Sequence, residues 1–139
     1  MISTQLNMLQ TAIDRKPNAI GYASLDPEAC VPLMESAKAA GIPAKVMIDC
    51  SHGNSRKQFK LQMEVCDSVA EQISGGEERI MGVMVESHLV EGRQDLSPDK
   101  PLTYGQSVTD ACINWDDSVA VMEKLAAAVR ARRLAEAAE

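Results

Sequence analysis

Aromatic residues are scarce in this chain. They make up 3% of its 139 residues, whereas apolar residues as a whole make up 45%. With few aromatics and plentiful alanine, valine, methionine and isoleucine, the composition favours a helix-rich α/β protein over an all-β sandwich. The length leaves room for one domain of ordinary size with its own apolar core.

The chain also lacks an excess of basic residues. Its formal net charge is −6, and its pI is about 4.9. Recognition of a nucleic-acid backbone requires a basic face, so we expect no nucleic acid as partner. The one basic cluster, residues 130–133, ends a predicted helix, where cations suit the helix dipole.

Several sequence signals of other protein classes are missing. No apolar run is long enough to span a membrane, and the amino terminus lacks the charged-then-apolar pattern of a secretion signal. Cys30, Cys50, Cys66 and Cys112 lie far apart without CxxC spacing, so neither a zinc knuckle nor a disulfide framework is indicated. There is no glycine-rich phosphate loop and no nucleophile elbow. We therefore expect reduced thiols in a cytoplasmic protein that has no membrane partner.

Helical stripes alternate along the chain with short apolar runs. The pattern predicts helices over residues 1–16, 26–40 and 56–74 and from 116 or 117 onward, strands over 19–23, 44–50 and 80–85, and a long loop over 87–115. Gly21 weakens the first of these strands. Strands that alternate with helices imply a parallel sheet, and hence an α/β fold.

Three positions bear on the helix boundaries. Gly41 is predicted to supply the left-handed C-cap of the second helix, and Ser55 the N-cap of the third. Pro32 conflicts with the second helix, because an internal proline costs ~3 kcal/mol. Either that helix begins nearer Val31, or it is kinked at the proline.

Polar side chains follow the second and third predicted strands. Asp49, Ser51 and His52 come at the end of one, and Glu86 at the end of the other. The carboxyl ends of neighbouring parallel strands meet at one edge of a sheet, where α/β enzymes place their chemistry. The long loop lies over the same end, and its Asp110 is the best third group for a site there.

Imidazole and carboxylate groups together suit a divalent metal such as Mn²⁺, Fe²⁺, Co²⁺ or Zn²⁺. Each signal alone has a structural alternative, since a single histidine is more often hydrogen-bonded than metal-bound and a strand-ending glutamate is usually solvated. His88 either faces the same site or packs in the loop, and we favour packing. Cys50 and Cys112 either ligate a soft metal or pack in the core, and packing is again favoured.

Three stretches resemble one enzyme family. They are residues 46–55 (VMIDCSHGNS), 82–92 (GVMVESHLVEG) and 104–113 (YGQSVTDACI), followed by Trp115. They resemble the carboxy-terminal part of 3-deoxy-7-phosphoheptulonate synthase (DAHP synthase), of the microbial feedback-regulated type. The resemblance covers about residues 26–133, and the family usually has alanine at the position of Gly53.

The resemblance implies a (β/α)₈ barrel that condenses phosphoenolpyruvate with erythrose 4-phosphate, the first step of aromatic amino-acid biosynthesis. It implies metal ligands at His52, Glu86 and Asp110, with His52 ending the seventh strand and Glu86 the eighth. Catalytic roles are implied for His52 and Asp49. Support of the ligands is implied for three further residues, namely Ser51, Asn54 and Ser87.

The same resemblance leaves parts of the family enzyme unmatched. The family's fourth metal ligand, a cysteine, and the Arg and Lys residues that hold phosphoenolpyruvate come from earlier strands. We interpret residues 1–25 as a divergent amino-terminal segment, 26–133 as a partial barrel (strands 7 and 8 with helices 6 to 8), and 134–139 as a frayed tail. A complete barrel takes ~250 residues.

An open piece of a barrel exposes apolar surface and unpaired strand edges. We therefore expect self-association or a complementary barrel fragment, and no activity from the chain alone. The alternative is a non-catalytic α/β remnant or metal-binding module. A related sugar-acid phosphate synthase of the same barrel group is disfavoured by residues 86–92 and 107–112.

Overall fold

The structure, a computed structural model, describes residues 2–18, 20, 27–42 and 45–138, which divide into two compact units at the 45/46 boundary. Its elements are α1 (Ile2–Asp14), α2 (Pro27–Ala39), β1 (Val46–Asp49), the short 3₁₀ helix η1 (Phe59–Leu61), α3 (Gln62–Ser74), β2 (Ile80–Met84), β3 (Val90–Arg93), β4 (Gln106–Ser107) and α4 (Trp115–Glu136). The mixture of helices and strands confirms the predicted α/β class. None of the described helices is long and apolar enough to cross a membrane.

The first unit contains α1 and α2. Leu9, Ile13 and Ala37 form its buried core. Gly41 has a φ of +76° and caps α2 as predicted, with the amide of Ile42 donating to the carbonyl of Ala37. The predicted strand over residues 19–23 lies outside the described residues, except for Ile20, which is in no strand.

Pro32 does not set the start of α2, which begins at Pro27 and continues through it. Of the two predicted alternatives, a helix start near Val31 is therefore wrong, and Pro32 lies inside the helix. The hydrogen bond that Pro32 cannot make would reach the carbonyl four residues back, at Glu28 in the first turn. A proline so near the start removes only one bond from the ladder, and the rest of the helix remains intact.

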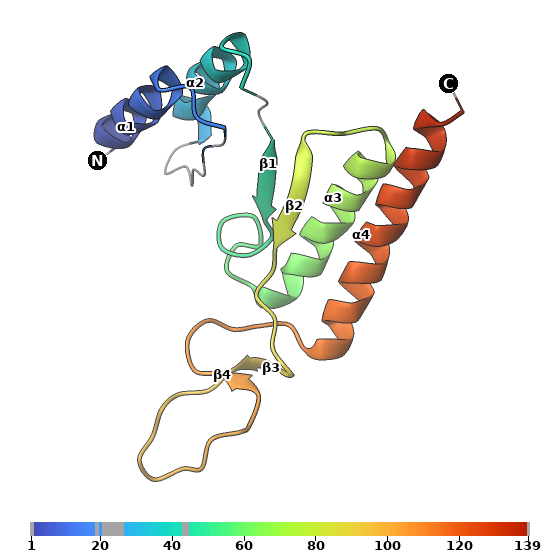
Figure 1. Ribbon diagram of the computed structural model, residues 1–139. Coiled ribbons are helices and arrows are strands. Elements are labelled where there is room, and N and C mark those ends of the chain that lie inside the picture. The colour runs from blue at the N-terminus through green and yellow to red at the C-terminus, as the bar shows by residue number, and fades with distance from the viewer. Residues whose placement is uncertain (1, 19, 21–26, 43–44, 139) are drawn as a thin grey trace. The chain divides into compact units, whose positions relative to one another are not determined.

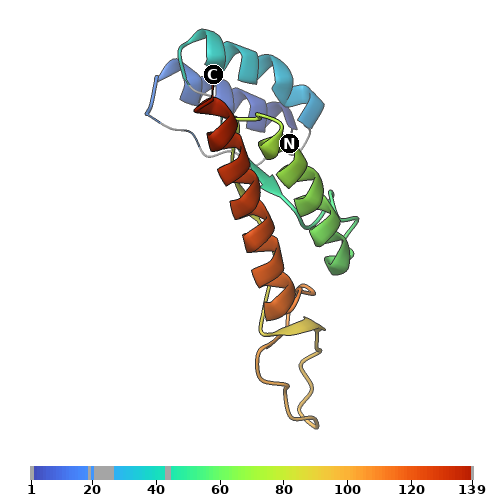
Figure 2. The same cartoon turned by 90° about the vertical axis from the view of Figure 1, so that its right-hand side faces the viewer.

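The second unit is built on two parallel strands and two helices. β1 pairs with β2 from Val46↔Ile80 to Asp49↔Met84, with an irregularity after Val46. Figure 1 shows α3 and α4 together on one side of this pair, and Figure 2 views the unit from that side. Ile48 and Val83 point toward the helices and pack against both buried clusters of the unit.

The core of the second unit lies between the strand pair and the two helices. It contains two apolar clusters, whose buried members are Val69, Ala70, Ile73, Ile80 and Ala128 in one and Cys50, Cys66, Ile113 and Val121 in the other. Within the second cluster the Sγ atoms of Cys50 and Cys66 lie 3.4 Å apart. The hydrogen bond with Cys66, together with burial, raises the pKa of the Cys50 thiol.

The segment predicted as a loop over residues 87–115 contains two short strands. β3 and β4 pair in parallel, from Val90↔Gln106 to Arg93↔Ser107. The side chain of Gln94 closes the long excursion between them, because its Nε2 donates to the carbonyls of Thr103 and Gln106. The plain-loop prediction was therefore wrong, although the segment does return to the end of the β1–β2 pair, as Figure 1 shows.

Two predicted helix starts also differ from the structure. α3 begins at Gln62 rather than near residue 56, because residues 51–57 form turns in which Arg56 and Lys57 have positive φ. Ser55 is consequently a buried turn residue and not an N-cap. α4 is capped by Asn114, whose Oδ1 accepts from the amide of Asp117, so the predicted caps at residues 116 and 117 lie inside the first turn.

Candidate metal centre

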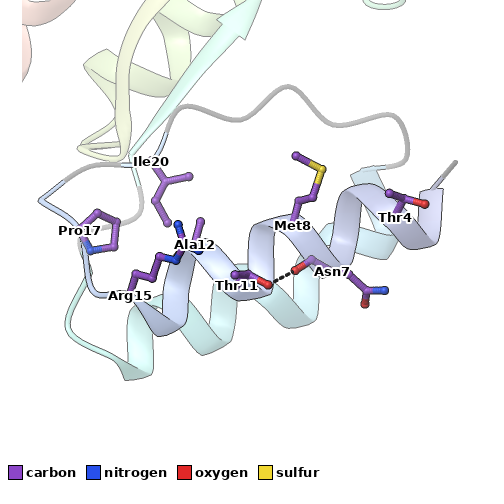
Figure 3. Close-up of a pocket in the computed structure, with 8 residues that line it drawn as sticks. All are labelled: Thr4, Asn7, Met8, Thr11, Ala12, Arg15, Pro17 and Ile20. Carbon is purple, nitrogen blue, oxygen red and sulfur yellow. Dashed lines mark hydrogen bonds between the residues drawn. The ribbon is translucent and has the colours of Figure 1, made fainter.

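Two hollows among the described residues differ sharply in their lining, and the larger of these two lies along α1. It has a volume of about 640 Å³, and Figure 3 shows its lining residues, which are Thr4, Asn7, Met8, Thr11, Ala12, Arg15, Pro17 and Ile20. Thr11 uses its hydroxyl within the helix, donating to the carbonyl of Asn7. Arg15 is the one ionisable side chain among its described lining residues, so those residues offer no pair of groups for acid–base or metal chemistry.

The smaller hollow lies at the carboxyl ends of β1 and β2, and its lining is chemically much richer. Its volume is about 120 Å³, and its lining residues are Ser51, His52, Lys57, Phe59, Glu86, Asp110 and Ala111. The turn after β1, the first residue of η1, Glu86 beyond the end of β2 and the segment after β4 all contribute to it. Chemistry, rather than size, therefore selects this pocket as the candidate site.

The turn after β1 is organised by Asp49, the last residue of the strand. Its Oδ1 accepts from the amide of Ser51 at 2.8 Å, and its Oδ2 lies 2.9 Å from Nδ1 of His52. The side chain of Asn54 donates to the carbonyl of Asp49 at 2.7 Å. These bonds hold a tight turn in which His52 has a φ of +45°, a conformation that L residues adopt rarely.

His52 is held in one orientation by Asp49. Because a carboxylate accepts hydrogen bonds, Nδ1 donates to Asp49, and in the neutral imidazole Nε2 then keeps its lone pair. The hydrogen bond and the charge of Asp49 raise the pKa of His52 above its usual value of 6.5, and the Glu86 and Asp110 carboxylates add smaller effects in the same direction. A carboxylate behind the outer nitrogen of a histidine is the arrangement commonly found at metal-binding histidines.

Glu86 follows β2 and faces His52 across the end of the sheet. Its Oε2 accepts a 2.6 Å hydrogen bond from the hydroxyl of Ser51, and its Oε1 lies 3.8 Å from Nε2 of His52. Ser51 is buried, and the Glu86 side chain is 21% exposed, so this bond is shielded from water. One carboxylate oxygen of Glu86 is thus fixed by Ser51, while the other points at the histidine.

Asp110 completes a group of three. Ligand atoms of His52, Glu86 and Asp110 all lie within 4.8 Å of one another. One imidazole nitrogen and two carboxylate oxygens at this spacing fit a divalent metal of the kind that binds mixed nitrogen and oxygen donors. These three residues were predicted from the sequence to meet at one sheet end, and they do so.

Other residues singled out in the sequence lie near this group without joining it. Ser87 forms a bridge to Ile113 through its backbone, and His88 is exposed, its Nδ1 accepting from the amide of Leu89. Cys50 and Cys112 are both buried thiols outside the group of three. The positions of the two cysteines agree with the packing roles that the sequence favoured. The packing role favoured for His88 is wrong, because its side chain is exposed.

Sequence reasoning missed a fully buried polar residue beside the site. Gln62, the first residue of α3, is 0% exposed, and its side-chain amide bonds to the backbone of Glu86. A signal was present: Gln62 stands in helical register with Cys66, Val69 and Ile73, which form the buried stripe. A polar side chain in such a stripe must find hydrogen-bond partners in the interior.

Comparisons with known proteins agree on one family. Residues 11–123 match the model of the DAHP synthetase I family. The chain is 62% identical over 99 residues to the Phe-sensitive phospho-2-dehydro-3-deoxyheptonate aldolase of Escherichia coli, covering 71% of this chain and 28% of that protein. It is 53% identical over 122 residues to the phospho-2-dehydro-3-deoxyheptonate aldolase of Haemophilus influenzae, covering 88% of this chain and 32% of that protein.

A solved structure gives the same answer. The phospho-2-dehydro-3-deoxyheptonate aldolase of Francisella tularensis matches with a TM-score of 0.66 at 48% identity, over 77% of this chain and 31% of that one. The chain thus spans less than a third of the length of each of these three proteins.

Proposed function

This chain belongs to the DAHP synthetase I family, and we propose that it forms the carboxy-terminal, metal-binding part of a 3-deoxy-7-phosphoheptulonate synthase. Such an enzyme condenses phosphoenolpyruvate with erythrose 4-phosphate. The observation that carries the proposal is the convergence of His52, Glu86 and Asp110 within 4.8 Å at the carboxyl ends of two parallel strands. That end of the strands is where barrel enzymes of this kind place their catalytic groups.

In this proposal the second unit is a piece of a (β/α)₈ barrel, with β1 as the seventh strand and β2 as the eighth. Two features support the assignment. The strands are parallel neighbours, and both accompanying helices lie on one side of them, as the outer helices of a barrel do (Figure 1). The boundaries predicted at residues 25 and 133 remain predictions, and the family match already begins at residue 11.

The donor set fits the proposed metal. His52 would bind through Nε2, because its Nδ1 is engaged with Asp49, and Glu86 and Asp110 would each supply a carboxylate oxygen. A divalent metal held there would act as a Lewis acid toward the aldehyde of the sugar phosphate. Donors of these types bind Mn²⁺, Fe²⁺, Co²⁺ or Zn²⁺.

The chain's own residues have distinct parts in this scheme. Asp49 keeps the proton of His52 on Nδ1 and holds the imidazole toward the pocket. Ser51 fixes one oxygen of Glu86, and Asn54 closes the turn over the carbonyl of Asp49. Ser87 supports the site through its backbone bridge to Ile113. The resemblance assigns the residues that hold phosphoenolpyruvate to earlier strands, so we propose no turnover from these residues alone.

The exposed face of the strand pair favours a partner. Met47 and Met81 are both largely exposed, and β1 and β2 pair only with each other among the described strands. Apolar strand surface of this kind is normally covered in folded proteins. We propose that it is covered by a second copy of this chain or by a complementary barrel fragment. The rival hypothesis is a metal-binding module without catalytic activity.

The test is a calorimetric titration of the chain with Mn²⁺, alongside His52→Ala and the matched control His88→Ala. These are the two histidines of the chain, and both follow a strand of the same pair. Saturable binding that is lost in His52→Ala and kept in His88→Ala supports the metal centre. Absence of binding in the unmodified chain, or equal loss in both variants, contradicts it.

The enzyme and the module are then distinguished by activity. Consumption of phosphoenolpyruvate in the presence of erythrose 4-phosphate and Mn²⁺ is measured with the chain alone and after supplying the earlier barrel strands of a family member as a separate fragment. Turnover that depends on both the fragment and His52 supports the enzyme. Metal binding without turnover under either condition supports the module.

A further inference from the structure

Gln62 has an unusual set of partners for a fully buried side chain. Its Oε1 accepts from the backbone amide of Glu86 at 2.8 Å, and its Nε2 donates to the backbone carbonyl of the same residue at 3.1 Å. The same Nε2 lies 3.1 Å from the carbonyl of Phe59, to which it also donates. One side-chain amide thus pairs with both main-chain polar groups of Glu86, as a neighbouring strand would.

Glu86 needs such a partner because it lies beyond the sheet. β2 ends at Met84, whose carbonyl accepts from the amide of Cys50, the first residue after β1. Glu86 lies two residues further on, and its backbone bonds to the side chain of Gln62. The carbonyl of Glu86 also accepts from the amide of Ile113 at 3.0 Å. The side-chain oxygen of Gln62 is therefore the hydrogen-bond acceptor of the Glu86 amide.

Packing alone does not explain a glutamine at this position. The stripe of α3 to which it belongs continues with Cys66, Val69 and Ile73, all buried in the apolar clusters. An apolar side chain of similar size would fill the same space without the cost of burying an amide. The amide is therefore best explained by the backbone that it binds.

We propose that Gln62 is a positioning residue for the metal centre and acts through Glu86. Its amide fixes the main chain of Glu86, and Ser51 fixes one oxygen of the carboxylate, so the remaining oxygen is presented toward His52 with little freedom. Anchoring at both ends reduces the reorganisation that metal binding requires. This inference rests on the proposed metal centre, because Glu86 is a ligand only in that proposal.

The inference predicts an effect of Gln62 on metal affinity that is separate from its effect on folding. Gln62→Met keeps the approximate size of the side chain and removes all three hydrogen bonds. Gln62→Glu keeps an acceptor for the amide of Glu86 but, when ionised, has no donor for the carbonyl. Val69→Ala is the matched control, since it weakens the apolar core from a position about two turns further along the same helix.

The experiment measures Mn²⁺ affinity by calorimetry for the unmodified chain and the three variants, with the thermal melt of each. Loss of a group that orients a metal ligand typically weakens metal affinity 10- to 100-fold. We expect about that loss for Gln62→Met, an intermediate loss for Gln62→Glu, and unchanged affinity for Val69→Ala. With saturating Co²⁺, the visible absorption of Gln62→Met should also differ in shape from that of the unmodified chain, which reports a changed coordination.

The outcomes separate the two proposals. If the unmodified chain does not bind Mn²⁺, the metal centre itself fails, and the inference fails with it. If the unmodified chain binds and the Gln62 variants bind equally well, only the inference is overturned. It is also overturned if Val69→Ala loses as much affinity as Gln62→Met, or if neither Gln62 variant gives a cooperative melt, because Gln62 would then act through stability.

Discussion

The hydroxyl of Ser51 donates a 2.6 Å hydrogen bond to Oε2 of Glu86, joining the residues that follow β1 and β2. Ser51 is 4% exposed, and the bond ends on a carboxylate, which makes it one of the stronger types of hydrogen bond in proteins. It ties the two halves of the candidate site together across the sheet end. The spacing of His52 and Glu86 therefore depends on a residue that is itself no candidate ligand.

Replacement of Ser51 by alanine tests this link. A buried hydrogen bond to a charged group contributes about 1.5–3 kcal/mol, so we expect a lower free energy of unfolding and a several-fold weaker Mn²⁺ affinity. Urea unfolding and calorimetric titration measure the two effects. Ser68→Ala is the control, because that serine lies on the exposed side of α3 and is not part of the group of three. Equal behaviour of the two variants would show that the Ser51 bond does not hold the site.

Asp49 is predicted to set the tautomer of His52. In Asp49→Asn the amide either donates to Nδ1 or accepts from it, so the proton is no longer fixed there and Nε2 is no longer reserved as a ligand atom. We expect Mn²⁺ affinity to fall about 10- to 100-fold. Asp67→Asn removes the same charge from the Lys124 ion pair, away from the pocket, and should leave the affinity unchanged. A matching loss in both variants would point to net charge rather than to the tautomer.

The sequence was most informative where one physical signal dominated. The apolar runs around Ile48 and Val83 predicted the two parallel strands, and the polar residues after them predicted the meeting of His52, Glu86 and Asp110. The family resemblance of those stretches was confirmed by the comparisons. The C-cap role of Gly41 could also be predicted, because a glycine followed closely by proline ends a helix for local steric reasons.

The errors arose where local preference competed with distant contacts. Ser55 is a good N-cap by type, but the bonds around Asp49 hold the following residues in turns, and α3 starts only at Gln62. β3 and β4 are two to four residues long and are paired across a separation that no local pattern reveals. Asn114 precedes two aspartates that are equally suited to capping, so residue type alone could not choose among them.

Glu91 links three separate segments and supplies a pH-dependent test. Glu91 pairs with Lys60 of η1 and accepts a hydrogen bond from Asn114, the N-cap of α4. These bonds lower the pKa of Glu91 below its usual value of 4.5, and the hydrogen bond from Lys60 has the largest effect. A lowered pKa in the folded state means that the stabilisation is present above pH 4.5 and is lost as the pH falls through the folded value.

We therefore expect Glu91→Gln to melt at a lower temperature than the unmodified chain at pH 7, and the difference in Tm to narrow as the pH falls below 4.5. Since both side chains of the ion pair are about half exposed, the difference should be small and should shrink in high salt. Glu123→Gln, on the exposed side of α4, controls for the loss of a negative charge. A constant difference in Tm across this pH range would contradict the assignment.

The exposed methionines of the strand pair make the association of the chain testable. Met47 and Met81 are 62% and 67% exposed, and Met122 on α4 matches them at 68%. If the strand face is the surface that a second copy covers, Met47→Lys combined with Met81→Lys should place charges in the interface and weaken self-association at least 10-fold, since an unpaired charge is costly to bury. Sedimentation over a range of concentrations measures this directly.

Met122→Lys is the control, because it adds a charge at an equally exposed methionine and should leave association unchanged. Two results would show that the strand face does not bind a second copy: a monomeric unmodified chain, or dissociation caused by Met122→Lys alone.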